Sequence, residues 1–170
     1  NLKDNSEDLL KLIGAKGDNK HKLGICVGPI SLCQSNSRVE QLIKEGFALA
    51  SSRDLAIAFH LDDQIFWRPN TSLGDQETIE WLDWSGQQSQ SRQLDWGRAA
   101  GQAPPILCMN SPRVMSAVSE RARFIGQTIS KEVLALRQSG KEYLFAGVIA
   151  GWETMIGKEY STQKRVGYHA

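Results

Sequence analysis

The sequence predicts an α/β fold in which parallel strands carry helices on their outer side, and the order of the segments is the main reason. Apolar segments at 23–28, 56–63 and 143–151 have the length and composition of strands. Segments with helical spacing of apolar residues stand between them, at 37–52 and between 112 and 139. Strands that alternate with helices are typical of parallel sheets, because a parallel connection needs a crossover that is usually helical.

The helices are predicted from the spacing of their apolar residues and from signals at their ends. The apolar side of the 37–52 helix is formed by Val39, Leu42, Ile43, Phe47 and Ala50. In the later helix, Ser111 is the candidate N-cap and Pro112 takes the first helical position. Ser139-Gly140 ends that helix. A shorter helix is expected at about 6–14, with Ser6 as its cap and Gly14 as its stop.

Two of the predicted strands end in acidic residues. Segment 56–63 ends in Asp62 and Asp63, and the apolar run at 143–151 is followed by Trp152 and Glu153. Sheets and barrels built from parallel strands place their chemistry at the carboxyl ends of the strands. The sequence therefore predicts an active-site rim that carries Asp62 and Glu153.

Side-chain alternation indicates which residues face this rim. Successive strand residues point to opposite faces, so small and polar residues share one face and bulky residues the other. The first set is Ala56, Ala58, His60 and Asp62, and the second is Ile57, Phe59 and Leu61. By the same rule Gly147, Ile149 and Glu153 share a face, and Gly24, Cys26 and Gly28 form a small face in the first strand. A bulge of one residue would reverse an assignment.

A long irregular segment at about 64–105 interrupts the alternation of strands and helices. It contains four of the five tryptophans, at Trp67, Trp81, Trp84 and Trp96. A segment of this length is usually functional or disordered, and its aromatic content argues against plain disorder. A short strand is expected at 106–109 and a polar loop at 157–170.

Composition excludes several classes of function. The 170 residues, 41% of them hydrophobic, suffice for one domain with a core, and 20 basic against 19 acidic residues give no broad attraction to nucleic acid or membrane. No apolar run is long enough to span a membrane. The three cysteines do not form a disulfide framework and the three histidines lack metal spacing, so no cofactor or resident metal is expected. Because the chain starts at Asn1, an upstream segment is expected to have been cleaved, trimmed or left out. No signal peptide is visible and cysteine usage does not identify the compartment, so the location is unknown, with a periplasmic or secreted one suspected.

Four segments resemble bacterial proteins related to the (β/α)8-barrel glycoside hydrolases, the β-galactosidase and β-amylase type. They are FHLDDQIFW (59–67), EWLDW (80–84), NSPRV (110–114) and FAGVIAGWETMIG (145–157), within a resemblance that covers roughly residues 23–170. It implies a single partial TIM-barrel domain over 1–170, with the tryptophan-rich segment as an insertion. A full barrel takes about 250 residues. The chain would therefore supply about the first half, and the remainder of the same polypeptide would complete it.

The resemblance also implies roles for individual residues. Glu153 would be the acid/base, although Trp152 replaces the Asn that commonly precedes it in such barrels, and the nucleophile would lie in the remainder of the polypeptide. Glycoside hydrolysis uses two carboxyl groups, one of which protonates the leaving oxygen. Tryptophans supply apolar walls for sugar rings, while polar groups bind the hydroxyls. The expected substrate-binding residues are His60, Asp62, Asp63, Trp67, Trp84, Asn110 and Trp152.

Other interpretations of these residues remain open at this point. Glu153 is also compatible with a capping or salt-bridging residue at a strand end, His60 with an interior histidine, and the tryptophans with anchors for a long loop. A carbohydrate-binding barrel without activity would keep the aromatic walls but lack a complete carboxylate pair. A metal-dependent hydrolase would use His60 and Asp62.

Overall fold

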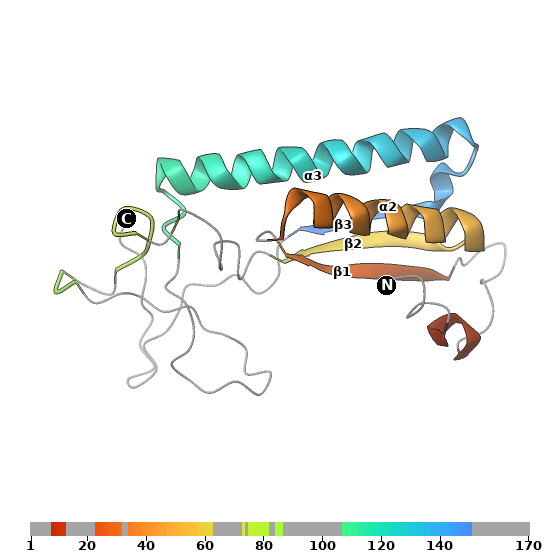
Figure 1. Ribbon diagram of the computed structural model, residues 1–170, viewed down its shortest axis with the longest axis horizontal. Helices are drawn as coiled ribbons and strands as arrows, with labels where there is room; N and C mark the ends of the chain where they lie inside the picture. Colours follow the sequence, from red (N-terminus) through yellow and green to blue (C-terminus); the bar gives the residue numbers. More distant parts are fainter. Residues whose placement is uncertain are drawn as a thin grey trace. The chain divides into compact units, whose positions relative to one another are not determined.

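The computed structural model describes residues 8–12, 23–31, 34–62, 73, 75–81, 84–86 and 107–150 (Figure 1). The chain divides into two compact units. One comprises Asn1–Asp63 and Ala122–Trp152, and the other comprises Gln64–Arg121 and Glu153–Ala170.

The first unit contains a three-stranded parallel sheet whose strands follow one another in chain order. Its strands are β1 (Gly24–Ser31), β2 (Ala56–Asp62) and β3 (Phe145–Ala150), and the sheet order is β1-β2-β3. Helix α2 (Asn36–Arg53) connects β1 to β2. Helix α3 (Pro112–Gln138) and the 3-10 helix η1 (Glu142–Leu144) precede β3. The predicted parallel α/β arrangement is confirmed to this extent.

Helix α2 forms where its apolar periodicity predicts it, and its ends have specific caps. The Ser35 hydroxyl accepts a hydrogen bond from the Arg38 amide at 3.3 Å, which satisfies one of the free amides of the first turn. At the other end, Asp54 adopts the left-handed conformation with φ of 55° and closes the helix. All five residues of the predicted apolar side are buried.

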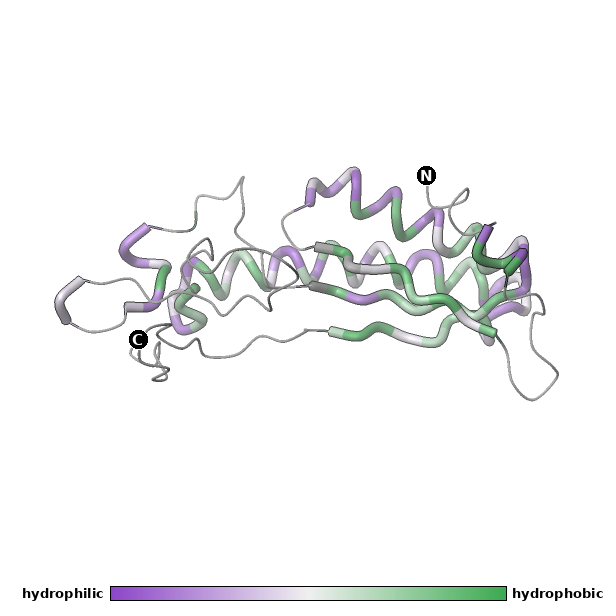
Figure 2. Tube along the Cα trace, turned by 90° about the horizontal axis from the view of Figure 1, so that it is seen from below, coloured by the Kyte–Doolittle hydropathy of each residue, from purple (hydrophilic) through white to green (hydrophobic). Residues whose placement is uncertain are grey.

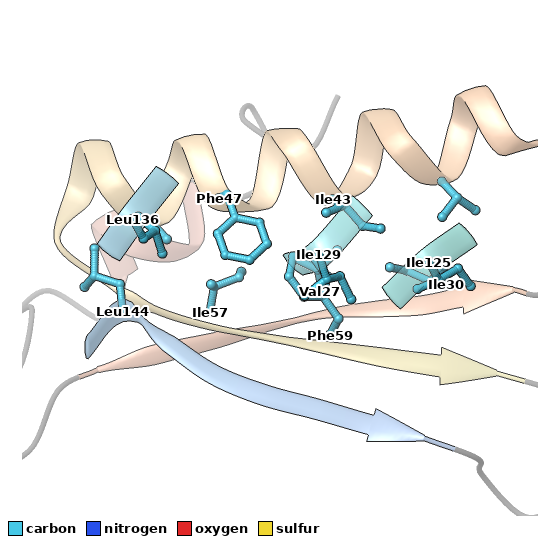
Figure 3. Close-up of a cluster of buried hydrophobic side chains, with 12 residues drawn as sticks. Val27, Ile30, Ile43, Phe47, Ile57, Phe59, Ile125, Ile129, Leu136 and Leu144 are labelled. Atoms are coloured by element: carbon cyan, nitrogen blue, oxygen red, sulfur yellow. The ribbon is translucent and has the colours of Figure 1, made fainter. Parts of the chain in front are cut away.

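Helix α2 and the part of α3 that belongs to this unit, residues 122–138, lie on the same face of the sheet and share one core with it (Figures 1 and 3). The core includes Val27 and Ile30 of β1, Ile57 and Phe59 of β2, Val39, Ile43, Phe47 and Ala50 of α2, Ile125, Ile129 and Leu136 of α3, and Leu144 of η1. Hydrophobic and hydrophilic residues alternate along the helices, while the strands are mostly hydrophobic (Figure 2). Burial of this apolar surface is the main stabilising contribution of the unit.

Helix α3 begins and ends at the predicted signals. The Ser111 carbonyl accepts the first helical hydrogen bond, from the Met115 amide at 2.9 Å, and Pro112 is the first helical residue. The amide of Lys141 donates to the Leu136 carbonyl at 2.8 Å and that of Gly140 donates to the Arg137 carbonyl at 3.0 Å. This pair of hydrogen bonds is a Schellman motif, and it requires the positive φ of 69° that Gly140 adopts.

Two predicted strand boundaries and one predicted short strand were wrong. Residues 142–144 form η1 rather than the start of a strand, so β3 begins at Phe145. Within 106–109, the described residues form only an isolated antiparallel bridge, between Leu107 and Ile79. Strand β1 continues past Gly28 to Ser31, because Pro29 falls at a register shift between Val27 and Ile30 where no ladder hydrogen bond is needed from it.

Two glycines make a matched pair of stability predictions. Gly140→Ala is expected to destabilise the protein by about 1 kcal/mol, because an L-residue is strained at its positive φ. Gly126→Ala is expected to stabilise it by about 0.5–1 kcal/mol, since Gly126 lies inside α3 and an added Cβ meets no atom within 4 Å. Urea unfolding of both variants measures this. Equal shifts in the same direction would contradict the assignment of the helix end.

Candidate functional site

The carboxyl ends of the three strands meet at one edge of the sheet. Ser31 pairs with Asp62 between β1 and β2, and Leu61 pairs with Ala150 between β2 and β3. The backbone of Asp62 therefore lies at the same edge as the end of β3. The side chain of Asp62 lies outside the described part of the structure, as do Asp63, Trp67, Trp152 and Glu153.

The sheet face opposite the helices carries the small residues and His60. Register places Cys26 beside Ala58, Ala58 beside Gly147, and His60 beside Ile149. Ala58 and His60 are half-buried, whereas Ile57 and Phe59 are buried under the helices. The predicted division of β2 into a small-to-polar face and a bulky face is thus confirmed for Ala56 to Phe59 and for His60.

A register shift in β3 determines which of its residues share this face with His60. The shift lies opposite Ile57 and Ala58, so Ala146 is the extra residue and Phe145 and Gly147 no longer share a face. Phe145 packs against the core, and Gly147 lies beside Ala58 with φ of 135°. Glycine tolerates this backbone conformation where other residues are strained. The predicted interior-type face is therefore right for Gly147 and Ile149.

Gly28 makes room for His60. An ideal Cβ built on Gly28 would lie 2.7 Å from the His60 Cβ and 3.3 Å from its Nδ1, which is closer than side-chain atoms normally approach. A residue larger than glycine would therefore displace His60 or separate β1 from β2. The sequence analysis assigned both residues to small-to-polar faces, but it did not predict that Gly28 leaves the space for the His60 side chain.

In the second unit, two predicted substrate-binding residues face solvent. Trp84 is fully exposed, and Asn110 is exposed in the turn before α3. In this conformation both side chains are accessible to a ligand. Their roles in substrate binding remain predictions.

An ion pair that the sequence did not indicate joins two distant segments of the second unit. Arg113 Nη1 lies 2.5 Å from Asp75 Oδ2 and 3.7 Å from a Glu77 carboxylate oxygen. Thr78 Oγ1 donates to Asp75 Oδ1 at 3.0 Å, and the Glu77 amide donates to the same oxygen at 3.1 Å. The hydrogen bond from Arg113 is the main cause that lowers the pKa of Asp75 from its usual value.

This ion pair yields a prediction for pH dependence. Because the folded-state pKa of Asp75 is lowered, its contribution to stability is present above the unfolded-state pKa and is lost as pH falls through the folded-state pKa. Arg113→Met is expected to raise the pKa of Asp75, measured by carboxyl NMR titration. Arg123→Met, at another exposed arginine of α3, is the control and should leave that pKa unchanged. Equal titration of Asp75 in both variants would contradict the pairing.

The described residues contain neither a cluster of metal-ligating side chains nor a helix that could cross a membrane. Within them, no three His, Cys, Asp or Glu side chains gather closely enough to hold a metal ion. Neither α2 nor α3 is apolar over enough of its length to cross a membrane.

The described geometry thus consists of a parallel sheet edge at Asp62, a small-residue face with His60 seated on Gly28, and a separate unit that carries Trp84 and Asn110. A comparison of the chain with protein families, with curated proteins and with solved structures finds no match in any of the three.

Proposed function

We propose that this protein is a carbohydrate-active hydrolase of the (β/α)8-barrel type, in which Glu153 is the general acid/base. One observation carries the proposal. Strands β1, β2 and β3 are adjacent in chain order, and the two helices that share their core lie on the same face. Right-handed crossovers between strands added in one direction put every helix on one face. That is how a barrel grows, whereas doubly wound sheets reverse direction and carry helices on both faces.

The open face of the sheet is suited to a barrel interior. It carries Ala58, Gly147 and His60, and the end of β2 delivers Asp62 to the edge where barrels place their active sites. Leu61 pairs with Ala150, so β3 ends at this same edge of the sheet. Glu153 is the third residue after β3 in the sequence, and such barrels carry a catalytic acid shortly after a strand end.

The chemistry follows from an acid held near apolar groups. A glutamic acid flanked by Trp152 would be poorly solvated, a setting that favours its protonated form and lets it donate to the glycosidic oxygen. Trp67, Trp84 and Trp152 would stack on sugar rings. His60, Asp62, Asp63 and Asn110 would bind hydroxyl groups. The second carboxyl group of the reaction would come from the remainder of the polypeptide.

The proposal also predicts that further strands cover the open face. Ile149 is 47% exposed in the structure, although it lies on that face beside His60. Parallel sheets are normally buried on both faces. In the full-length protein, Ile149→Ala is therefore expected to cost about 2–5 kcal/mol, as for a buried isoleucine. Urea unfolding measures the cost, and a loss below about 0.5 kcal/mol would contradict closure of a barrel over this face.

Activity of the full-length protein tests the function itself. A panel of aryl glycosides that differ in sugar and anomeric configuration is incubated with the purified protein, and release of the phenol is measured. We expect hydrolysis of at least one member. Binding of sugars without hydrolysis of any glycoside would instead identify a carbohydrate-binding protein. If the protein neither binds sugars nor hydrolyses any glycoside, the proposal is overturned.

A further inference from the structure

In the second unit, the described residues bury one carboxylate oxygen of Glu80 and supply no hydrogen-bond partner for it. Glu80 is 8% exposed, and its Oε2 is shielded from solvent without a hydrogen-bond partner in the described structure. Asp75 and Glu77, the described acidic residues nearby in sequence, are both exposed. Burial of an unpaired carboxylate is strongly unfavourable, and glutamine or leucine would fill similar space at lower cost.

The surroundings of Glu80 are well ordered rather than a loose loop. Ile79 forms a bridge with Leu107, and the Cys108 amide donates to the Thr78 carbonyl at 2.9 Å. On the other side, Trp81 is half-buried, and its Nε1 donates to the Gln76 carbonyl at 3.2 Å. Hydrogen bonds therefore hold the backbone before Glu80 and the indole of Trp81 after it. Such fixing holds a polar group in place before a ligand arrives, which is how binding sites lower the entropic cost of association.

From this arrangement we infer that Glu80 is a substrate-binding residue whose carboxylate accepts hydrogen bonds from carbohydrate hydroxyl groups. Sugar hydroxyls are donors without charge, so they satisfy a buried carboxylate without bringing a second ion into the site. The adjacent Trp81 offers an aromatic ring of the kind that packs against sugars. The chemical class of the ligand rests on the proposed function, whereas the unpartnered state of Glu80 does not.

The experiment compares Glu80→Gln with Glu77→Gln in the full-length protein. Glutamine keeps the shape of the side chain but removes the charge. Glu77 is exposed and lies three residues away, so it controls for the loss of one negative charge in the same segment. Three quantities are measured for each variant: the melting temperature, sugar affinity by titration calorimetry with the sugars of the glycoside panel, and hydrolysis of the panel.

If Glu80 binds substrate, Glu80→Gln melts at the same or a higher temperature than the wild type but binds the sugar at least about 10-fold more weakly, as expected for the loss of a hydrogen bond to a charged group. Glu77→Gln should change neither. Unchanged sugar affinity in Glu80→Gln would overturn the inference even where the wild type hydrolyses glycosides. A marked fall in melting temperature would also overturn it, since it would show that the carboxylate stabilises the fold.

The same measurements separate this inference from the proposed function. A wild-type protein that binds sugars through Glu80 but hydrolyses none would retain the inference and reject the hydrolase. A wild-type protein that binds none of the sugars would overturn the assignment of a carbohydrate ligand to Glu80.

Discussion

Glu153→Gln is expected to lower the hydrolysis of phenyl glycosides by the full-length protein about 10²–10⁴-fold, the range that a general acid/base contributes. Glutamine is nearly the same size as glutamic acid but cannot donate a carboxyl proton to the leaving oxygen. Sugar affinity should change far less than the rate, because the acid acts mainly in the transition state. Steady-state kinetics with the best substrate of the panel measures both quantities.

The leaving group provides a sharper test of the acid role. Dinitrophenolate leaves without protonation, whereas phenolate needs a proton, so the loss caused by Glu153→Gln should be much smaller for dinitrophenyl than for phenyl glycosides. Glu120→Gln is the matched control, since Glu120 is an exposed residue of α3 and its replacement should leave both rates unchanged. An equal loss for the two leaving groups would assign Glu153 a role other than proton donation.

The local pattern of the chain predicted the two long helices and the faces of β2 correctly. The apolar spacing in 37–52 identified the buried side of α2, and the Ser111, Pro112 and Gly140 signals identified the ends of α3. These features depend on residues close together in the chain, where capping groups and helical periodicity act directly. Strand alternation likewise separated Ile57 and Phe59 from Ala58 and His60.

Features that depend on contacts between residues far apart in the chain were not predicted from the sequence. Gly46 interrupts the interior of α2, where glycine is unfavourable, and only the packing explains it. A Cβ there would lie 3.0 Å from a ring carbon of Phe59 in β2. The ion pair between Asp75 and Arg113 joins residues 38 positions apart, and the seat of His60 on Gly28 joins two strands. None of these pairs leaves a periodic trace in the sequence.

In the candidate site, too, features set by the local pattern were predicted and features set by distant contacts were not. Alternation placed His60 on the face opposite the helices and Asp62 at the end of β2, and the structure has both backbones there. Burial of Glu80 was not predicted, because the surrounding segment has neither helical nor strand periodicity. The buried hydrophobic residues described in the second unit, which include Leu73, Ile79, Leu107 and Val114, lie far apart in the sequence. A buried acid in an irregular segment becomes visible only when the contacts around it are known.

Shortening a buried side chain of the central strand, β2, is expected to have a large effect on the stability of the shared core. Ile57 of β2 is fully buried and belongs to the core that the sheet shares with α2 and α3. Ile57→Ala is expected to cost about 2–5 kcal/mol in the free energy of unfolding, because it removes buried apolar surface and leaves a cavity that a dense core fills only in part. Ile57→Val should cost about 0.5–1.5 kcal/mol, since it removes one methylene group. Urea unfolding of the full-length protein measures both.

Leu134→Ala is the control for this series. Leu134 lies on α3 and is 53% exposed, so loss of the same number of carbon atoms there should change stability by no more than about 0.5 kcal/mol. Equal losses in the free energy of unfolding for Ile57→Ala and Leu134→Ala would mean that the helices do not pack on the sheet as described. The division of β2 into a helix-facing side and an open side would then lose its basis, and with it the placement of His60 on the face proposed to line the barrel.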